Sequence, residues 1–163
     1  MQTGTGILAS TIAAVALLAG GCNQAPDATV AAAQPADATF QEFGDYEVHF
    51  NALRTDALTP DVAAAYGIQR STNRVMLTVT VLHKQADRAP RKPVDANVQV
   101  DAYNLNGQLK NLEVRRISEG EAIYYIGDVG ISGAEILVFD ISVTAQEGAA
   151  PMKVKFKREF YAS

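Results

Sequence analysis

Apolar and polar residues alternate along several segments of the chain between Phe40 and Ser163. A period of two places successive side chains on opposite faces of an extended strand, so each such segment buries one face only. The clearest run lies at 152–160, where lysines separate the apolar residues. The pattern predicts further strands at 46–52, 75–81, 94–102 and 137–143, and weaker ones at 109–117 and 122–126.

Turn residues divide these segments, and only one short helix is expected. The Asn106-Gly107 pair predicts a hairpin turn, because a two-residue turn needs positive φ at its central residues. A second hairpin is expected at 118–121. Thr59 suits a helix N-cap, Pro60 suits the first helical position, and Gly67 suits the end of the helix.

The number of strands and turns predicts the fold class. About seven short strands and one short helix are typical of an all-β antiparallel two-sheet sandwich of the immunoglobulin-like kind. A small closed β-barrel is the alternative. The segment 40–163 holds all the aromatic residues, both histidines and every Lys and Arg of the chain, and its length suits one hydrophobic core. We expect it to be a single domain.

The chain ahead of this domain has a different pattern. Its apolar stretch at 7–19 is too short for a transmembrane helix, which needs about 20 residues, but it fits the apolar region of a secretion signal. Small residues then precede Cys22, the only cysteine in the chain. This arrangement resembles a bacterial lipoprotein signal, although Ala19 stands where Leu is usual. The resemblance implies that residues 1–21 are removed and that Cys22 carries the lipid.

Two alternatives for Cys22 stay open: an ordinary unpaired thiol, or a cysteine removed by a different signal peptidase. Lipidation is favoured because an exported thiol would have no partner in the chain. Two or more acyl chains hold a protein on a membrane where one chain does not. Asn23 follows the cysteine, which resembles sorting to the outer membrane. We therefore expect a lipid-anchored protein that faces the periplasm.

Residues 22–39 join this anchor to the domain. From Asn23 to Thr39 the chain is built of small and polar residues with a single Val and no aromatic residue. Such a segment has too little apolar surface to offset the entropy of ordering it. We expect a flexible tether.

Composition narrows the classes of function. The formal net charge is −4 at pH 7 and the chain has no basic arm, so nucleic acid is not an expected partner. A zinc site made of cysteines is excluded in the mature domain, which has no cysteine left after lipidation. Met76 and Met152 occupy alternating strand positions, which favours core packing over copper binding. We expect no cofactor and no metal.

A hydrolase or peptidase would need titratable side chains that converge in a cleft. The sequence offers His49 on the polar face of its strand, His83 at a strand end, and the carboxylates Glu119, Glu121 and Asp140. No Gly-x-Ser-x-Gly motif accompanies them, and nothing in the pattern brings them together. An enzyme whose site assembles only in three dimensions is therefore the alternative function.

The segment between the expected helix and the next strand holds the candidate binding residues, which are Tyr66, Arg70, Asn73 and Arg74. Binding residues are frequent in loops, and Arg beside an aromatic residue is common at the centre of protein interfaces. The alternative is structural. Asn73 and Ser71 would then bond to nearby backbone groups, and the arginines would pair with carboxylates.

Lysines at every second position of the last strand allow two interpretations. Lys153, Lys155 and Lys157 could contact lipid phosphates or an acidic partner. Lysines on an outer strand also keep a sheet edge from pairing with other chains, and we favour this protection of an edge.

Several segments of the chain resemble a known family. They are 43–52 (FGDYEVHFNA), 58–60, 65–70, 119–126 (EGEAIYYI) and 153–161. They are similar to an uncharacterised proteobacterial envelope family, catalogued as domain of unknown function 4426. The resemblance covers 40–163 and implies an exported, often lipid-anchored, all-β domain of Gram-negative bacteria. It supplies no catalytic residues.

These patterns together predict the function only in outline. We expect a non-enzymatic periplasmic lipoprotein that binds or supports another component of the envelope. Its partners would be the membrane, through Cys22, and an envelope protein.

Overall fold

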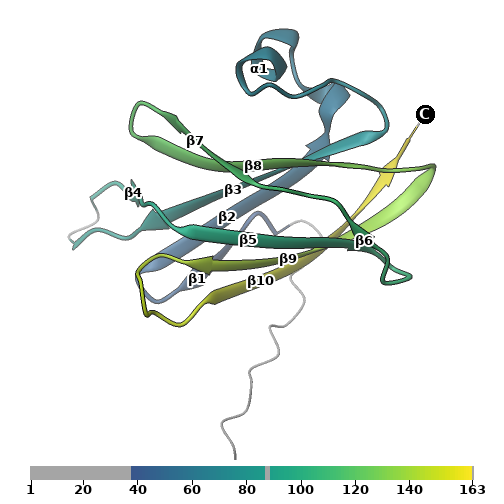
Figure 1. The fold of residues 1–163 in the computed structure, drawn as a ribbon. Coiled ribbons are helices and arrows are strands. Elements are labelled where there is room, and N and C mark those ends of the chain that lie inside the picture. Colours follow the sequence, from purple (N-terminus) through teal and green to yellow (C-terminus); the bar gives the residue numbers. More distant parts are fainter. Residues whose placement is uncertain (1–37, 87–88, 163) are drawn as a thin grey trace, which may run out of the picture.

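The computed structural model describes residues 38–86 and 89–162, and these form two antiparallel β-sheets packed face to face (Figure 1). Sheet A has the strand order β1-β2-β3-β8-β7, with β4 beside β3, and sheet B has the order β10-β9-β5-β6. The strands are β1 (Phe40–Phe43), β2 (Tyr46–Arg54), β3 (Arg74–His83), β4 (Lys92–Pro93), β5 (Asn97–Asn104), β6 (Leu109–Lys110), β7 (Arg115–Glu119), β8 (Ala122–Gly130), β9 (Ala134–Thr144) and β10 (Met152–Tyr161).

This strand order confirms the predicted immunoglobulin-like sandwich. In chain order, β2-β3-β8-β7 occupy the places of strands A, B, E and D, and β10-β9-β5-β6 occupy those of G, F, C and C′. Every paired strand is antiparallel to its neighbour. The barrel alternative is wrong, because within the described residues both sheets end in edge strands and neither closes on itself.

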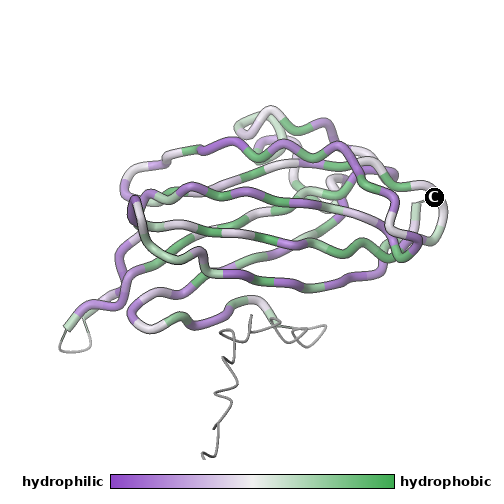
Figure 2. Tube along the Cα trace, turned by 60° about the horizontal axis from the view of Figure 1, so that its bottom comes forward, coloured by the Kyte–Doolittle hydropathy of each residue, from purple (hydrophilic) through white to green (hydrophobic). Residues whose placement is uncertain are grey.

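The alternating pattern explains the core between the sheets. Hydrophobic and polar residues alternate along the strands (Figure 2). The buried hydrophobic residues of both sheets form one core cluster between the sheets. At the centre, the Phe156 ring stacks on Phe50 at 4.7 Å and on Phe139 at 4.9 Å between ring centroids. Burying one such side chain stabilises the fold by about 1.5–3 kcal/mol. These rings form the centre of the hydrophobic core that stabilises the sandwich.

A second, smaller core lies on the outer face of sheet A. The helix α1 (Pro60–Ala65) and the segment after it cover this face, and Ile68 packs there on Met76 and Ile126. The predicted N-cap is confirmed, since Thr59 Oγ1 accepts a hydrogen bond from the backbone N–H of Val62 at 3.4 Å. The short 3-10 helix η1 (Thr55–Ala57) precedes α1.

The predicted strand at 109–117 is wrong in one respect: it is two strands in different sheets. β6 pairs with β5 in sheet B, whereas β7 pairs with β8 in sheet A. Residues 111–114 cross between the sheets. The crossing backbone lies against β8, where a Cβ on Gly127 would stand 2.6 Å from the carbonyl oxygen of Glu113. The apolar residues Leu109, Leu112, Val114 and Ile117 do not keep a strict period of two across this change of sheet.

Two other boundaries differ from the prediction. The strand expected at 94–102 begins only at Asn97, after the separate β4. The edge strand β1 was not predicted, because its four residues are too few to display a period. The hairpin at 118–121 is confirmed by the pairing of Glu119 with Ala122.

The Asn-Gly hairpin joins β5 to β6, but its loop has a different length from the one predicted. The backbone N–H of Gly107 donates to the carbonyl of Asn104 at 2.9 Å, and the N–H of Asn104 donates to the carbonyl of Gln108 at 3.1 Å. The loop therefore spans residues 105–107. Gly107 has a φ of 76°, which fits the left-handed position of a three-residue hairpin loop.

Candidate binding sites at the two ends of the sandwich

The predicted binding loop lies at the end of the sandwich where α1 projects (Figure 1). Two of its residues are held by neighbouring groups. Arg74 forms an ion pair with Asp128 of β8, with 2.6 Å between Nε and Oδ2. The carbonyl of Asn73 accepts a hydrogen bond from the N–H of Ile131 at 2.9 Å, and its side chain accepts one from Ser71. These contacts fix the entry of the chain into β3.

Of the other two residues of the loop, Arg70 is exposed and Tyr66 is half-buried. Tyr66 donates its hydroxyl proton to Glu119 Oε2 at 3.1 Å, and burial together with this carboxylate raises the pKa of Tyr66. Arg70 donates to the backbone carbonyl of Asp56 at 2.8 Å, and Arg115 donates to the carbonyl of Tyr66. Two guanidinium charges at this end are thus bonded to carbonyl groups. The loop residues are therefore held by local hydrogen bonds, and this end of the sandwich carries the positive charge of the arginines.

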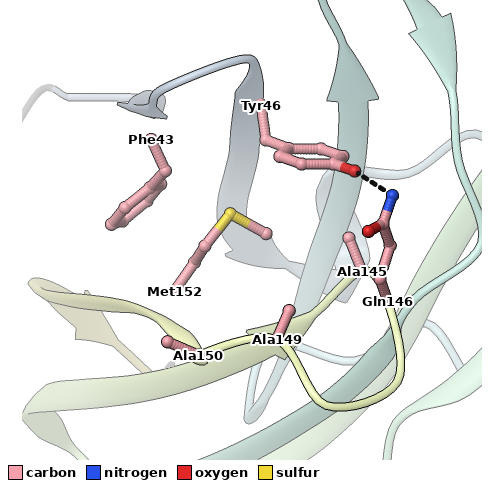
Figure 3. Close-up of a pocket in the computed structure, with 7 residues that line it drawn as sticks. All are labelled: Phe43, Tyr46, Ala145, Gln146, Ala149, Ala150 and Met152. Atoms are coloured by element: carbon pink, nitrogen blue, oxygen red, sulfur yellow. Dashed lines mark hydrogen bonds between the residues drawn. The ribbon is translucent and has the colours of Figure 1, made fainter.

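An apolar pocket of about 220 Å³ opens at the other end of β2 (Figure 3). Its walls are two aromatic rings, a thioether, small side chains and one amide, from Phe43, Tyr46, Met152, Ala145, Ala149, Ala150 and Gln146. Phe43 ends β1, Tyr46 begins β2, and Met152 begins β10. The alanines and the amide belong to the connection between β9 and β10. The pocket is therefore built where two edge strands and one loop meet.

Polar groups of the pocket are few and lie on one side. Gln146 Nε2 donates to the Tyr46 hydroxyl at 3.1 Å, which leaves the hydroxyl proton for another acceptor. Behind the pocket, His83 packs edge-on against the Tyr46 ring with 4.9 Å between centroids. Such a site can hold an apolar group beside one hydrogen-bonding group.

Sequence reasoning missed this pocket. Met152 was assigned to a core face, and the structure does place it next to the core, half-buried at the first position of β10. Phe43 belongs to the strand that was not predicted, and Tyr46 is only the first residue of the strand predicted at 46–52. The available signal was an apolar face that continues to the first residue of a strand, next to a loop of alanines at 145–150.

The titratable candidates for catalysis have separate surroundings. His49 pairs with Thr80 and lies with it on the outer face of sheet A. His83 is three residues beyond Thr80 on β3, and therefore lies on the inner face. Asp140, in sheet B, pairs with Lys155 at 2.8 Å. Glu119 is bonded to Tyr66 and Glu121 is exposed beside its hairpin turn. Within residues 38–86 and 89–162, no group of three or more His, Cys, Asp and Glu side chains could hold a metal ion.

Glu47 was not singled out from the sequence, yet its side chain is 2% exposed. Arg91 Nε lies 2.6 Å from one carboxylate oxygen, and His49 Nε2 lies 3.1 Å from the other. Burial opposes ionisation of this carboxyl, but the bonds from His49 and Arg91 outweigh it, so the pKa of Glu47 lies below its ordinary value. The group ties the loop after β3 to β2. Its role is structural.

Cys22, the signal at 1–21 and the tether as far as residue 37 lie outside the described residues, so these remain predictions. The last two residues assigned to the tether contact the domain: Ala38 packs against the core, and the carbonyl of Thr39 accepts a hydrogen bond from the N–H of Phe50 at 2.8 Å. In the part of the chain that the structure covers, no helix is long and apolar enough to span a membrane.

Comparison with known proteins identifies relatives of the domain. The model of the DUF4426 family, a domain of unknown function, matches residues 40–163. The crystal structure of a DUF4426 family protein from Pseudomonas aeruginosa PAO1 is 36% identical in sequence, with a TM-score of 0.63. The similarity covers 76% of this chain and 94% of that one. The comparison with curated proteins gave no match.

Two structures of FetP from uropathogenic Escherichia coli strain F11 are also similar, one of them a copper-bound variant. They are 9% and 8% identical to this chain, and both have a TM-score of 0.53. They cover 76% of this chain, and the similarity spans 93% and 95% of their own lengths. At this identity the likeness is one of fold.

Proposed function

We propose that this chain, which belongs to the DUF4426 family, is a lipid-anchored binding module of the bacterial envelope. It holds an apolar group of a second envelope component in the pocket formed by Phe43, Tyr46 and Met152. The observation that carries the proposal is that pocket, which presents two rings and a thioether at one end of the sandwich. Its reactive groups are few, so we infer binding without catalysis.

The chemistry of the pocket supports a role in recognition. Thioether and aromatic surfaces adapt to apolar groups of different shape, which suits them to binding. The Tyr46 hydroxyl and the Gln146 amide at one side of the pocket can orient the bound group by hydrogen bonding. A pocket of about 220 Å³ has room for one large side chain or a short acyl segment rather than a large metabolite.

Membrane attachment rests on the sequence. Lipid at Cys22 would hold the domain on the outer membrane, facing the periplasm, and the tether from Asn23 to Thr39 would span on the order of 20–25 Å as a flexible coil. FetP, which shares the fold, was expressed in the periplasm of Escherichia coli. The short tether would keep the pocket within reach of membrane-bound partners while the domain reorients.

Copper is not part of the proposal, although one FetP structure is copper-bound. The donors of this chain do not fit such a site. Met76 is 5% exposed and packs on Ile126 below the α1 segment. Met152 is the only thioether in the pocket, and the His83 Nδ1 that lies behind it is 3.2 Å from the Gln85 amide nitrogen.

The proposal is tested by crosslinking in intact cells. A photoreactive residue replaces Ala149 at the rim of the pocket, and the matched control carries it at Ala65, an exposed alanine at the end of α1. We expect a discrete product from position 149 and none from 65. A second substitution that fills the pocket, Ala150→Phe, should abolish the product without lowering the melting temperature. A product from position 65 alone would move the binding surface to the Arg70 end and overturn the proposal.

A further inference from the structure

The strand β10 has one side that no other strand covers. It lies at the edge of sheet B, and among the described residues it pairs with β9 alone. Its last residues are shielded by β2: Arg158 donates to Asn51 Oδ1 at 2.8 Å, and Arg54 donates to the carbonyl of Tyr161 at 2.6 Å. Among residues 38–86 and 89–162, no strand other than β9 is hydrogen-bonded to residues 152–157 of β10. An uncovered edge presents unpaired N–H and C=O groups to an incoming strand.

The open half of β10 begins at the pocket. Met152 is both the first residue of the strand and one wall of the pocket. A strand added along residues 152–157 would therefore run past the pocket opening. In recognition by strand addition, main-chain hydrogen bonds give affinity, and pockets for alternate side chains give specificity. The open edge of β10 and the pocket next to its first residue therefore meet both requirements of this mode of binding.

Charge on the outer face of β10 selects the partner. Lys155 is already engaged, since it lies 2.8 Å from Asp140, which raises the pKa of Lys155 to about 12. Lys153 and Lys157 are exposed, and no carboxylate of the described chain pairs with them. Directly opposite residues of antiparallel strands lie on the same face, where opposite charges attract and like charges repel. The two lysines thus disfavour a basic strand and favour an acidic one.

We propose that residues 152–157 accept an extended segment of the partner as an added antiparallel strand. That segment is acidic at the two positions opposite Lys153 and Lys157, and its side chain opposite Met152 is apolar and enters the pocket. The inference rests on the proposed function, because it names the occupant of the same pocket. It also explains why lysines that protect an edge against random pairing are compatible with one chosen partner.

The test uses two capped synthetic peptides and the soluble Cys22→Ser protein. The acidic peptide is Glu-Val-Thr-Val-Glu-Leu, and the control has Lys in place of both Glu. Methionine methyl groups labelled with carbon-13 report binding by NMR, with Met152 in the pocket and buried Met76 as the internal control. Amide hydrogen exchange reports whether residues 153–157 gain a strand neighbour.

We expect the acidic peptide to shift the Met152 methyl signal and to slow exchange along β10, with Met76 unchanged. The basic peptide should bind about tenfold more weakly. The variant Lys153→Glu with Lys157→Glu should reverse this preference, and its unchanged melting temperature would show that it is folded. A Met152 shift without slower exchange in β10 would overturn strand addition while leaving the pocket as a binding site. Absence of any shift, or equal binding of both peptides, would also overturn the inference.

Discussion

Glu47 shows how far a residue's surroundings can depart from its place in the pattern. Alternation puts it correctly on the polar face of β2 together with His49, but residues on such a face are usually exposed to solvent. Arg91, which follows Glu47 by 44 positions, bonds to its carboxylate. The other partner, His49, is itself stacked on the Phe40 ring at 5.3 Å between centroids. Arg91 and Phe40 come from segments that have no period of their own. Sequence periodicity therefore predicts on which face of the sheet a residue lies, but not which residues from other segments bury it.

The lowered pKa of Glu47 predicts how stability depends on pH. A carboxyl with a folded-state pKa below its ordinary value of 4.5 stabilises the fold above that pH, and this contribution is lost as the pH falls through the folded-state pKa. Glu47→Gln should lower the free energy of unfolding at pH 7. The difference between wild type and variant should shrink below pH 4.5. Urea unfolding from pH 7 to pH 3 measures it, and a difference that stays constant across this range would contradict the assignment.

At the scale of elements, strands with several alternating positions were predictable, and β2, β3, β9 and β10 were all found near their expected bounds. The segments that connect one sheet to the other were not predictable in this way. The crossing at 111–114 contains no Gly or Pro to mark the change of sheets. The pocket was also missed, because its walls come from strands that are far apart in sequence and adjacent only after the sheets pack.

Close contact between the crossing and β8 yields a prediction for Gly127. A Cβ at this position would meet Glu113 O at 2.6 Å and Val114 Cγ1 at 3.2 Å, so Gly127→Ala should destabilise the domain by about 1–3 kcal/mol. Gly130 lies on the same strand and has no atom within 4 Å of a Cβ, so Gly130→Ala is the matched control. We expect the control to change stability by less than about 0.5 kcal/mol. Equal effects in chemical unfolding would contradict a tight crossing.

The predicted binding loop at 66–74 also shows that contacts between segments far apart in sequence cannot be assigned from the pattern. The sequence identified a loop with arginines and an aromatic residue, and both the loop and its charges are found. The carboxylate that pairs with Arg74 belongs to β8, 54 positions later, and could not be assigned in advance. Arg70, in contrast, contacts a carbonyl and keeps its charge outside. Binding at this loop stays a prediction.

At the scale of the whole molecule, the fold class and the family could be predicted from the sequence because both depend on many residues at once. The predicted attachment to the membrane depends on a single residue, Cys22. Cys22→Ser removes the only thiol, so we expect the protein to move from the membrane fraction to the soluble periplasmic fraction. Fractionation followed by immunoblotting measures this, with wild type processed in parallel. Unchanged membrane association would contradict a lipid anchor at this residue.

Occupation of the pocket inside the cell is the central claim, and Met152 reports it directly. Peroxide oxidises an accessible thioether to the sulfoxide, whereas Met76 is buried and serves as the internal standard. Oxidation is quantified by mass spectrometry after equal peroxide exposure of intact cells and of purified protein. If a partner fills the pocket, Met152 should oxidise several-fold more slowly in cells than in the purified protein, relative to Met76. Equal relative rates in both samples would contradict a pocket that binds a component of the envelope.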